Sequence, residues 1–151
     1  MYRAAYIGID LAASERRCTG FVALVEEFSG RIVLKRATCI FSDNDILNKV
    51  LYFRDYANRV VIAIDAPLSD VVKFREVDRK MISLGFRVFP PTFGWMRMLT
   101  IRGTRIAHEL AKYGLEVIET HPRSVLLSSS CTSWSDLVQY LGLEIRETDL
   151  R

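Results

Sequence analysis

The sequence predicts an α/β fold, a mixed sheet in which an antiparallel three-strand meander is extended by parallel strands and helices cover the faces. Three apolar segments open the chain at 4–10, 20–27 and 31–41, and short connections join them. Helical and strand-like segments then alternate from residue 42 onward. A hairpin makes neighbours antiparallel, whereas a strand that follows a helix pairs in parallel, so both kinds of pairing are expected.

The middle of the chain is expected to supply the first helix and a buried strand. Apolar residues such as Ile46 and Val50 recur at helical spacing over 42–59, after a cap at Ser42. The continuous apolar run 60–65 is typical of a strand buried on both faces, in the centre of the sheet. Because a helix precedes it, this strand should join an earlier strand by a right-handed parallel crossover.

The second half predicts two more helices, a strand and a short last helix. We expect helices over 70–85 and 96–114, a strand over 115–120, a Ser-rich turn over 126–135 and a helix over 136–142. The apolar stripe of the first of these helices is Phe74, Val77, Met81 and Leu84. The next is expected to bury Ile106, Leu110 and Tyr113 and to expose Arg102, Arg105 and Lys112.

The bulk composition indicates one globular domain over residues 1–151, since half of the residues are apolar. No segment approaches the ~20 apolar residues of a membrane span, and the first residues resemble a strand rather than a signal peptide. We therefore expect a cytoplasmic protein without a membrane partner. The three cysteines, Cys18, Cys39 and Cys131, are widely spaced, which predicts reduced thiols and no zinc site.

The net charge is a weak guide to the binding partners of this protein. The formal net charge is only +3, so nucleic acid is a possible partner that the charge alone does not establish. The sequence carries no indication of oligomeric state.

Two apolar strands end in an aspartate, Asp10 in "YIGIDLA" and Asp65 in "VVIAIDAPLS". A single aspartate in such a place is most often a turn cap. If the two strands are parallel neighbours, however, the carboxylates emerge side by side, where they repel unless a cation neutralises them. Oxygen ligands favour Mg²⁺ or Mn²⁺, and Glu119, at the end of "LEVIET", is a third candidate ligand.

A set of motifs resembles one known family. In order, "YIGIDLA", "TGFVAL", "VVIAIDAPLS", "REVDRKMISLG", "VFPPTFGWMRMLTIRG" and "LEVIETHPRS" resemble the DUF429 family of predicted nucleases, over roughly residues 4–126. The resemblance implies an RNase H-like fold and a site formed by Asp10 and Asp65 with Glu119 close by. It also implies metal-dependent hydrolysis of phosphodiester bonds.

Further residues have two interpretations each. Arg75 and Asp78 form either an intrahelical ion pair or a phosphate-binding arginine with its supporting carboxylate. His121 is either a loop histidine or a residue that shuttles a proton or holds a phosphate. Arg102 and Arg105 are candidates for phosphate contact, although a solvated helix face explains them as well.

The segment around Pro90, Pro91 and Trp95 is expected to pack in the core, with a lid or base-stacking platform as the alternative. At the other end of the chain, the family resemblance implies a final helix with another acidic residue. Either Asp149 stands in for it or the chain is shortened, and we expect one bound ion at best and weak or no cleavage.

Two other function classes remain. One is a catalytically inactive RNase H-like module that binds nucleic acid or protein. The other is an actin-like or sugar-kinase nucleotide-binding domain, which the single glycine of "DLAASERRCTG" and the short chain disfavour.

Overall fold

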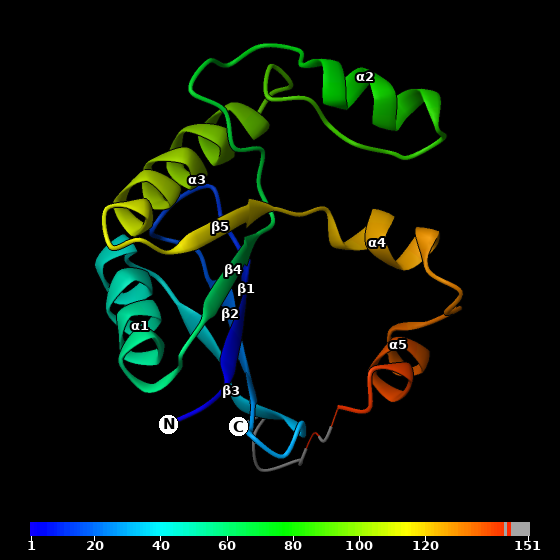
Figure 1. Ribbon diagram of the computed structural model, residues 1–151. Helices are drawn as coiled ribbons and strands as arrows, with labels where there is room; N and C mark the ends of the chain where they lie inside the picture. The colour runs from blue at the N-terminus through cyan, green and yellow to red at the C-terminus, as the bar shows by residue number, and fades with distance from the viewer. Residues whose placement is uncertain (144, 146–151) are drawn as a thin grey trace.

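The computed structural model describes residues 1–143 and 145, and its centre is a five-stranded sheet (Figure 1). The strands are β1 (Ala4–Asp10), β2 (Thr19–Glu26), β3 (Ile32–Ile40), β4 (Val60–Ile64) and β5 (Glu116–Glu119). The helices are α1 (Asp43–Tyr56), α2 (Glu76–Ser83), α3 (Met96–Ala111), α4 (Pro122–Ser128) and α5 (Trp134–Tyr140).

The sheet has the strand order β3-β2-β1-β4-β5. The first three strands pair antiparallel as a meander, and β4 pairs in parallel with both β1 and β5. The predicted α/β class with an RNase H-like mixed sheet is therefore confirmed. The interior position of β4 agrees with its continuous apolar sequence, because both of its edges are paired.

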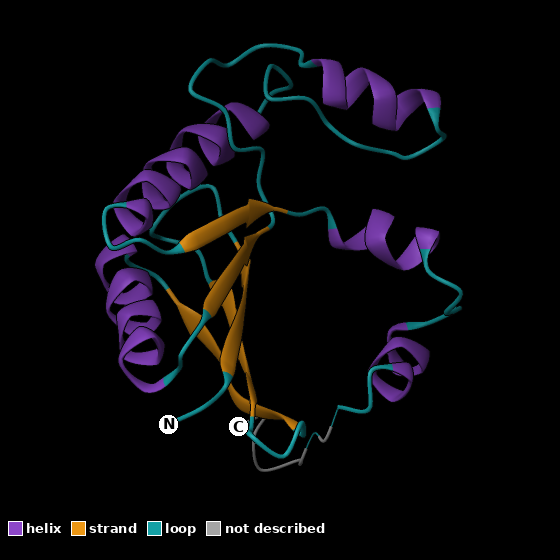
Figure 2. Ribbon diagram, viewed as in Figure 1, coloured by secondary structure: helices purple, strands orange, loops and turns teal. Residues whose placement is uncertain are grey.

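The hydrophobic core lies between one face of the sheet and the helices α1 and α3, which Figure 2 shows on the same side of the strands. The residues of β1 alternate in burial, with Ile7 and Ile9 pointing into this core. Helix α1 begins where the sequence predicts, because the Ser42 hydroxyl accepts a 3.0 Å bond from the Asp45 backbone N–H. The core includes Ile9 and Ile64, the residues just before Asp10 and Asp65, so packing holds the ends of β1 and β4 in place.

The last two helices, α4 and α5, lie on the other side of the sheet from α1 and α3 (Figure 1). Helix α5 agrees with the predicted short helix. Helix α4 occupies the beginning of the predicted Ser-rich turn, so that prediction is wrong over its first residues. Pro122 at the start of α4 and the capping side chain of His121 favour a helix there.

Parts of two predicted apolar stripes are exposed, although Ile106 and Leu110 are buried as predicted. Helix α2 is shorter than the predicted helix over 70–85, and Val77 and Leu84 on its apolar stripe are 51% and 62% exposed. The cause is its position: α2 lies beyond the end of the sheet rather than against a face (Figure 1). Tyr113 follows the end of α3 and is also exposed, not inward.

The prediction of three reduced cysteines is wrong for two of them. A disulfide joins Cys18 to Cys39, with a Cα–Cα distance of 5.4 Å. The pairing follows from the register, since Gly20 lies opposite Cys39 and brings the start of β2 against β3. Cysteines this far apart in sequence give no sign of this contact until the register is known.

None of the described helices is both long and apolar enough to cross a membrane. The cytoplasmic localisation stays a prediction. Asp149 lies outside the described residues.

Candidate functional site

The two strand-end aspartates leave the sheet together. In the parallel pairing of β1 with β4, Ile9 lies opposite Ile64, and the Asp65 backbone N–H donates a 2.8 Å bond to the Ile9 carbonyl. Asp10 and Asp65 are therefore next to each other at the carboxyl edge of the sheet. This is the adjacency that the predicted crossover requires, and such edges are where α/β sheets bind ligands.

The surroundings of Asp65 disfavour its negative charge. Partial burial raises the pKa of the Asp65 carboxyl, the nearby Asp10 carboxylate raises it further, and His121 partly opposes both effects. Asp10 itself is exposed. A cation between the two carboxylates would remove the repulsion, so the pair is suited to a hard divalent ion.

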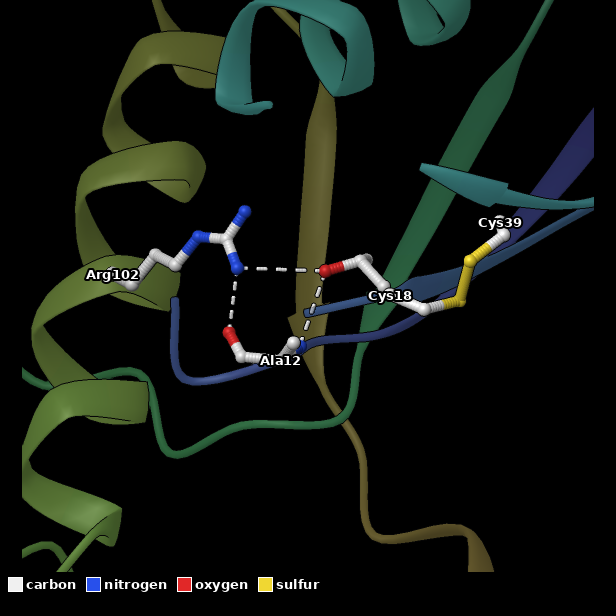
Figure 3. Close-up of a disulfide and its surroundings, with 5 residues drawn as sticks. Ala12, Cys18, Cys39 and Arg102 are labelled. Carbon is white, nitrogen blue, oxygen red and sulfur yellow. Dashed lines mark hydrogen bonds between the residues drawn. A yellow bond between two sulfur atoms is a disulfide. The ribbon is translucent and has the colours of Figure 1, made fainter. Parts of the chain in front are cut away.

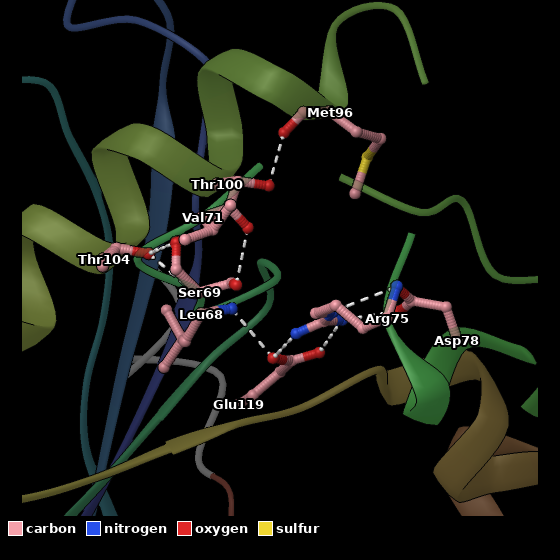
Figure 4. Close-up of polar contacts among 9 residues, drawn as sticks. All are labelled: Leu68, Ser69, Val71, Arg75, Asp78, Met96, Thr100, Thr104 and Glu119. Atoms are coloured by element: carbon pink, nitrogen blue, oxygen red, sulfur yellow. Dashed lines mark hydrogen bonds and ion pairs between the residues drawn. The ribbon is translucent and has the colours of Figure 1, made fainter. Parts of the chain in front are cut away.

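Glu119 belongs to a second group of side chains, the Arg75 cluster, which consists of Arg75, Asp78 and Glu119 (Figure 4). The Arg75 guanidinium donates to both oxygens of Glu119 at 2.7 and 2.8 Å, and to both oxygens of Asp78 at 3.0 and 2.7 Å. Glu119 also accepts a 2.8 Å bond from the Leu68 backbone N–H. The cluster thus ties the loop after β4, the start of α2 and the end of β5 to one another.

The predicted set of three metal-binding carboxylates is not assembled. Among the described residues, no group of three or more His, Cys, Asp or Glu side chains is placed to hold a metal ion. Glu119 lies at the expected edge of the sheet, but the pair of bonds from Arg75 occupies both of its oxygens. This pairing is also the largest cause of the raised pKa of Arg75. A ligand role for Glu119 stays a prediction that requires Arg75 to release it.

The intrahelical interpretation of Arg75 and Asp78 accounts for only part of their contacts. Arg75 is the cap residue before α2, and the buried Asp78 carboxylate accepts its backbone N–H at 2.9 Å. The side chain of Arg75 nevertheless reaches across to β5. Its contact with Glu119 was not predicted, because it depends on where the loop after β4 places the start of α2.

Arg102 was predicted to face solvent, and that is wrong, since its side chain is only 5% exposed. It donates to the carbonyls of Ala12 and Phe41 at 2.7 and 2.9 Å and to the Asp43 carboxylate at 2.7 Å. We call these four residues the Arg102 cluster; Figure 3 shows the arginine with Ala12 and the nearby disulfide. With its donors engaged in this way, Arg102 is not part of the phosphate site that we propose.

Arg105 shares the same carboxylate, since its guanidinium contacts Asp43, while most of its side chain is exposed.

One signal for the burial of Arg102 is present in the sequence. Arg102 precedes Ile106 by four residues and follows Leu99 by three, so it lies on the buried face of α3.

His121 caps α4, and its Nδ1 lies 2.6 Å from the Ser124 hydroxyl, an arrangement that leaves the other ring nitrogen outside the cap. The residue lines the same cavity as the two aspartates. Its part in proton transfer or phosphate contact stays a prediction.

A cavity of about 580 Å³ contains the candidate site. The ionisable residues of its lining are Asp10, Asp65, Arg75, Asp78, Glu119 and His121. The remaining wall is largely apolar and includes Met81, Phe89, Trp95 and Met96. The prediction that Trp95 packs in the core is wrong, because the side chain is 54% exposed and stands at the start of α3 along this wall.

Comparison with solved structures finds two similar chains. One is the mitochondrial Holliday junction resolvase of yeast, 10% identical with a TM-score of 0.48, over 99% of this chain and 68% of that one. The other is RuvC from T. thermophilus in complex with a Holliday junction substrate, 12% identical with a TM-score of 0.43, over 97% and 85% of the two chains. At this level the likeness describes the path of the chain and says nothing about its chemistry. No family model and no curated protein matches the sequence.

Proposed function

We propose that this protein is a metal-dependent nuclease that hydrolyses phosphodiester bonds with Mg²⁺ or Mn²⁺ held by Asp10 and Asp65. The observation that carries the proposal is the pair of neighbouring carboxylates at the carboxyl edge of parallel strands, inside one cavity with an arginine and a histidine. The motif resemblance to the DUF429 family supports the same proposal.

The donor set fits a hard divalent ion. Both side chains offer only carboxylate oxygens, and the raised pKa of Asp65 means that a cation at this place relieves a repulsion already present. Bound there, the ion would activate water and neutralise charge on the phosphate. The role of Asp10 and Asp65 is to hold and orient it.

Arg75 connects phosphate binding to the third carboxylate. A guanidinium has five N–H donors, and four bonds to Asp78 and Glu119 engage most of them. A phosphate oxygen that replaces Glu119 on Arg75 would receive a charge-assisted pair of bonds and release Glu119 beside Asp65. In this proposal, substrate completes the acidic set, and His121 at the cavity wall exchanges a proton with water or with the leaving oxygen.

The test is cleavage of labelled single-stranded, duplex and four-way-junction DNA and of RNA, in Mg²⁺, Mn²⁺ or EDTA. Asp10→Asn and Asp65→Asn should each reduce the metal-dependent rate by about a hundredfold or more, the loss typical of a transition-state stabilising group. Asp55→Asn is the matched control, since Asp55 is an exposed aspartate of α1 paired only with its neighbour Arg54 in the described contacts. Equal rates in all three variants would contradict the proposal.

A second candidate function is a nucleic-acid-binding module without catalysis. It is favoured by the engagement of Glu119 with Arg75, which leaves two carboxylates for a metal ion. Binding of any of the same nucleic acids without cleavage in Mn²⁺ would support this candidate over the nuclease.

A further inference from the structure

The cavity of the candidate site is also lined by aromatic rings that the proposed chemistry does not use. Phe89, Phe93 and Trp95, the aromatic cluster, belong to the segment between α2 and α3 and are each about half exposed, at 50%, 51% and 54%. Rings of this size are ordinarily among the main contributors to a core. Phe89 and Trp95 line the cavity and Phe93 stacks on Phe89, so these exposed rings indicate a surface for a ligand.

The aromatic cluster is held in place before any ligand arrives. Phe89 and Phe93 stack with their ring centroids 5.0 Å apart, and Trp95 lies 6.3 Å from Phe89. A turn closed by a 2.9 Å bond from the Phe93 N–H to the Pro90 carbonyl sets their spacing, and Pro91 is fully buried beneath it. Ligand binding would thus cost little ordering of this segment.

The same cavity joins the aromatic cluster to the phosphate chemistry. Phe89 and Trp95 line it together with Asp10, Asp65 and Arg75. A ligand that contacts both the rings and Arg75 combines a flat apolar group with a phosphate, and a nucleotide has both. In a duplex each base already stacks on its neighbours, so a ring of the protein reaches a base face only where the base is unpaired.

We propose that Phe89 and Trp95 stack on an unpaired nucleobase next to the phosphate at the acidic edge, so that the substrate class is single-stranded or locally unpaired nucleic acid. The inference rests on the proposed function for its phosphate site. The stacking itself requires no metal ion, which makes it measurable separately from cleavage.

The experiment measures binding of the whole chain to oligothymidine in EDTA by fluorescence anisotropy, against a duplex and an abasic strand of the same length. Trp95→Ala and Phe89→Ala should each weaken oligothymidine binding by about fivefold to a hundredfold, the loss of one stacked base. Neither change should alter binding of the abasic strand. Trp95→Phe keeps a ring and should therefore retain most of the affinity for oligothymidine. That result would show that the effect of alanine is not misfolding.

Trp134→Ala is the matched control, because Trp134 of α5 is 50% exposed and is absent from the cavity lining. It should bind all three nucleic acids like the original chain. Equal losses on oligothymidine and on the abasic strand, no loss in Trp95→Ala, or a preference for the duplex would each overturn the stacking inference.

Cleavage assays in Mn²⁺ separate this inference from the proposed function. Metal-dependent cleavage that is indifferent to Trp95→Ala and Phe89→Ala would overturn the stacking site and leave the nuclease standing. Ring-dependent binding of oligothymidine without cleavage in any metal would support the stacking site and remove the nuclease.

Discussion

Two mostly buried arginines hold the two sides of the candidate site, and their environments differ. Arg102 is bonded to two backbone carbonyls and to Asp43, and it lies inside the packed face between α3 and the strand ends. Among the described residues, the side chain of Arg75 bonds to carboxylates alone, and one of them, Glu119, is 35% exposed. Carbonyls fixed in the chain cannot leave an arginine, whereas an exposed carboxylate can be replaced. The Arg102 cluster is therefore suited to hold structure, and the Arg75 cluster to exchange partners.

Arg102→Ala should give the largest effect. It leaves the Ala12 and Phe41 carbonyls without a partner and removes the buried partner of Asp43, and breaking a buried pair typically costs about 3–5 kcal/mol of unfolding free energy. Urea unfolding measures it. Arg97→Ala, an exposed site on the same helix, should change the free energy by about 0.5 kcal/mol or less. Similar losses in both variants would show that the Arg102 cluster does not hold the strand ends.

Arg75→Ala should cost somewhat less stability, about 3 kcal/mol. It leaves the buried Asp78 carboxylate without its ion partner, but a backbone N–H still bonds to Asp78 and water can solvate the exposed side of Glu119. The same change removes a positive charge and frees a carboxylate near Asp65, so Mn²⁺ should bind more tightly. Calorimetric titration with Mn²⁺ measures the second effect. Arg75→Ala combined with Glu119→Gln should lose most of the gain in affinity, and unchanged Mn²⁺ binding in Arg75→Ala would contradict the exchange of partners.

The features that the sequence predicts depend on local determinants, and those that it does not predict depend mainly on long-range contacts. The antiparallel meander and the parallel pairing of β4 were predictable, because a continuous apolar strand after a helix has few ways to pair, and the adjacency of Asp10 and Asp65 follows if its partner is β1. The burial of Arg102 was missed although its spacing to Ile106 places it on the inner face of α3. The residue type points the other way, since arginine is rarely buried.

Other features depended on contacts that no local pattern encodes. The bond from Arg75 to Glu119 joins residues 44 positions apart, across a loop whose path the sequence does not define. The exposure of Trp95 was missed for the opposite reason, because large aromatic rings are usually buried. Both misses lie at the cavity, where a binding surface departs from the rules that govern the core.

Asp65→Asn should have a smaller effect that depends on pH. The pKa of Asp65 is raised above its ordinary value of 3.8 in the folded chain, so the unfolded chain ionises first as the pH rises. Stability is therefore lost upward from that value until the folded carboxyl has also ionised, and the loss is then constant. Asp65→Asn should be slightly more stable than the original chain at neutral pH and equal to it at low pH. Thermal melts of both chains at neutral and at low pH measure this difference. A larger gain in stability at low pH would contradict the raised pKa of Asp65.

Gly20→Ala should give the smallest change in stability and tests how closely the packed side of the site positions Asp10. Gly20 lies opposite Asp10 in the pairing of β1 with β2, and a Cβ at this place would stand 3.3 Å from the Asp10 Cβ. That contact is tight enough to displace Asp10 by a few tenths of an ångström without preventing β2 from pairing with β1. We expect unfolding free energy to change by about 1 kcal/mol or less, while Mn²⁺ binding weakens, because carboxylate ligands tolerate little misplacement.

Gly8→Ala is the control for this last change. Gly8 lies two residues before Asp10 on the same face of β1, and an added Cβ there meets nothing within 4 Å. It should leave Mn²⁺ binding unchanged and should be neutral or slightly stabilising, because alanine restricts the unfolded chain. If both alanines weaken Mn²⁺ binding equally, the effect does not come from the contact of the new Cβ at position 20 with Asp10. If only Gly20→Ala does, the site depends on the space that this glycine leaves for Asp10.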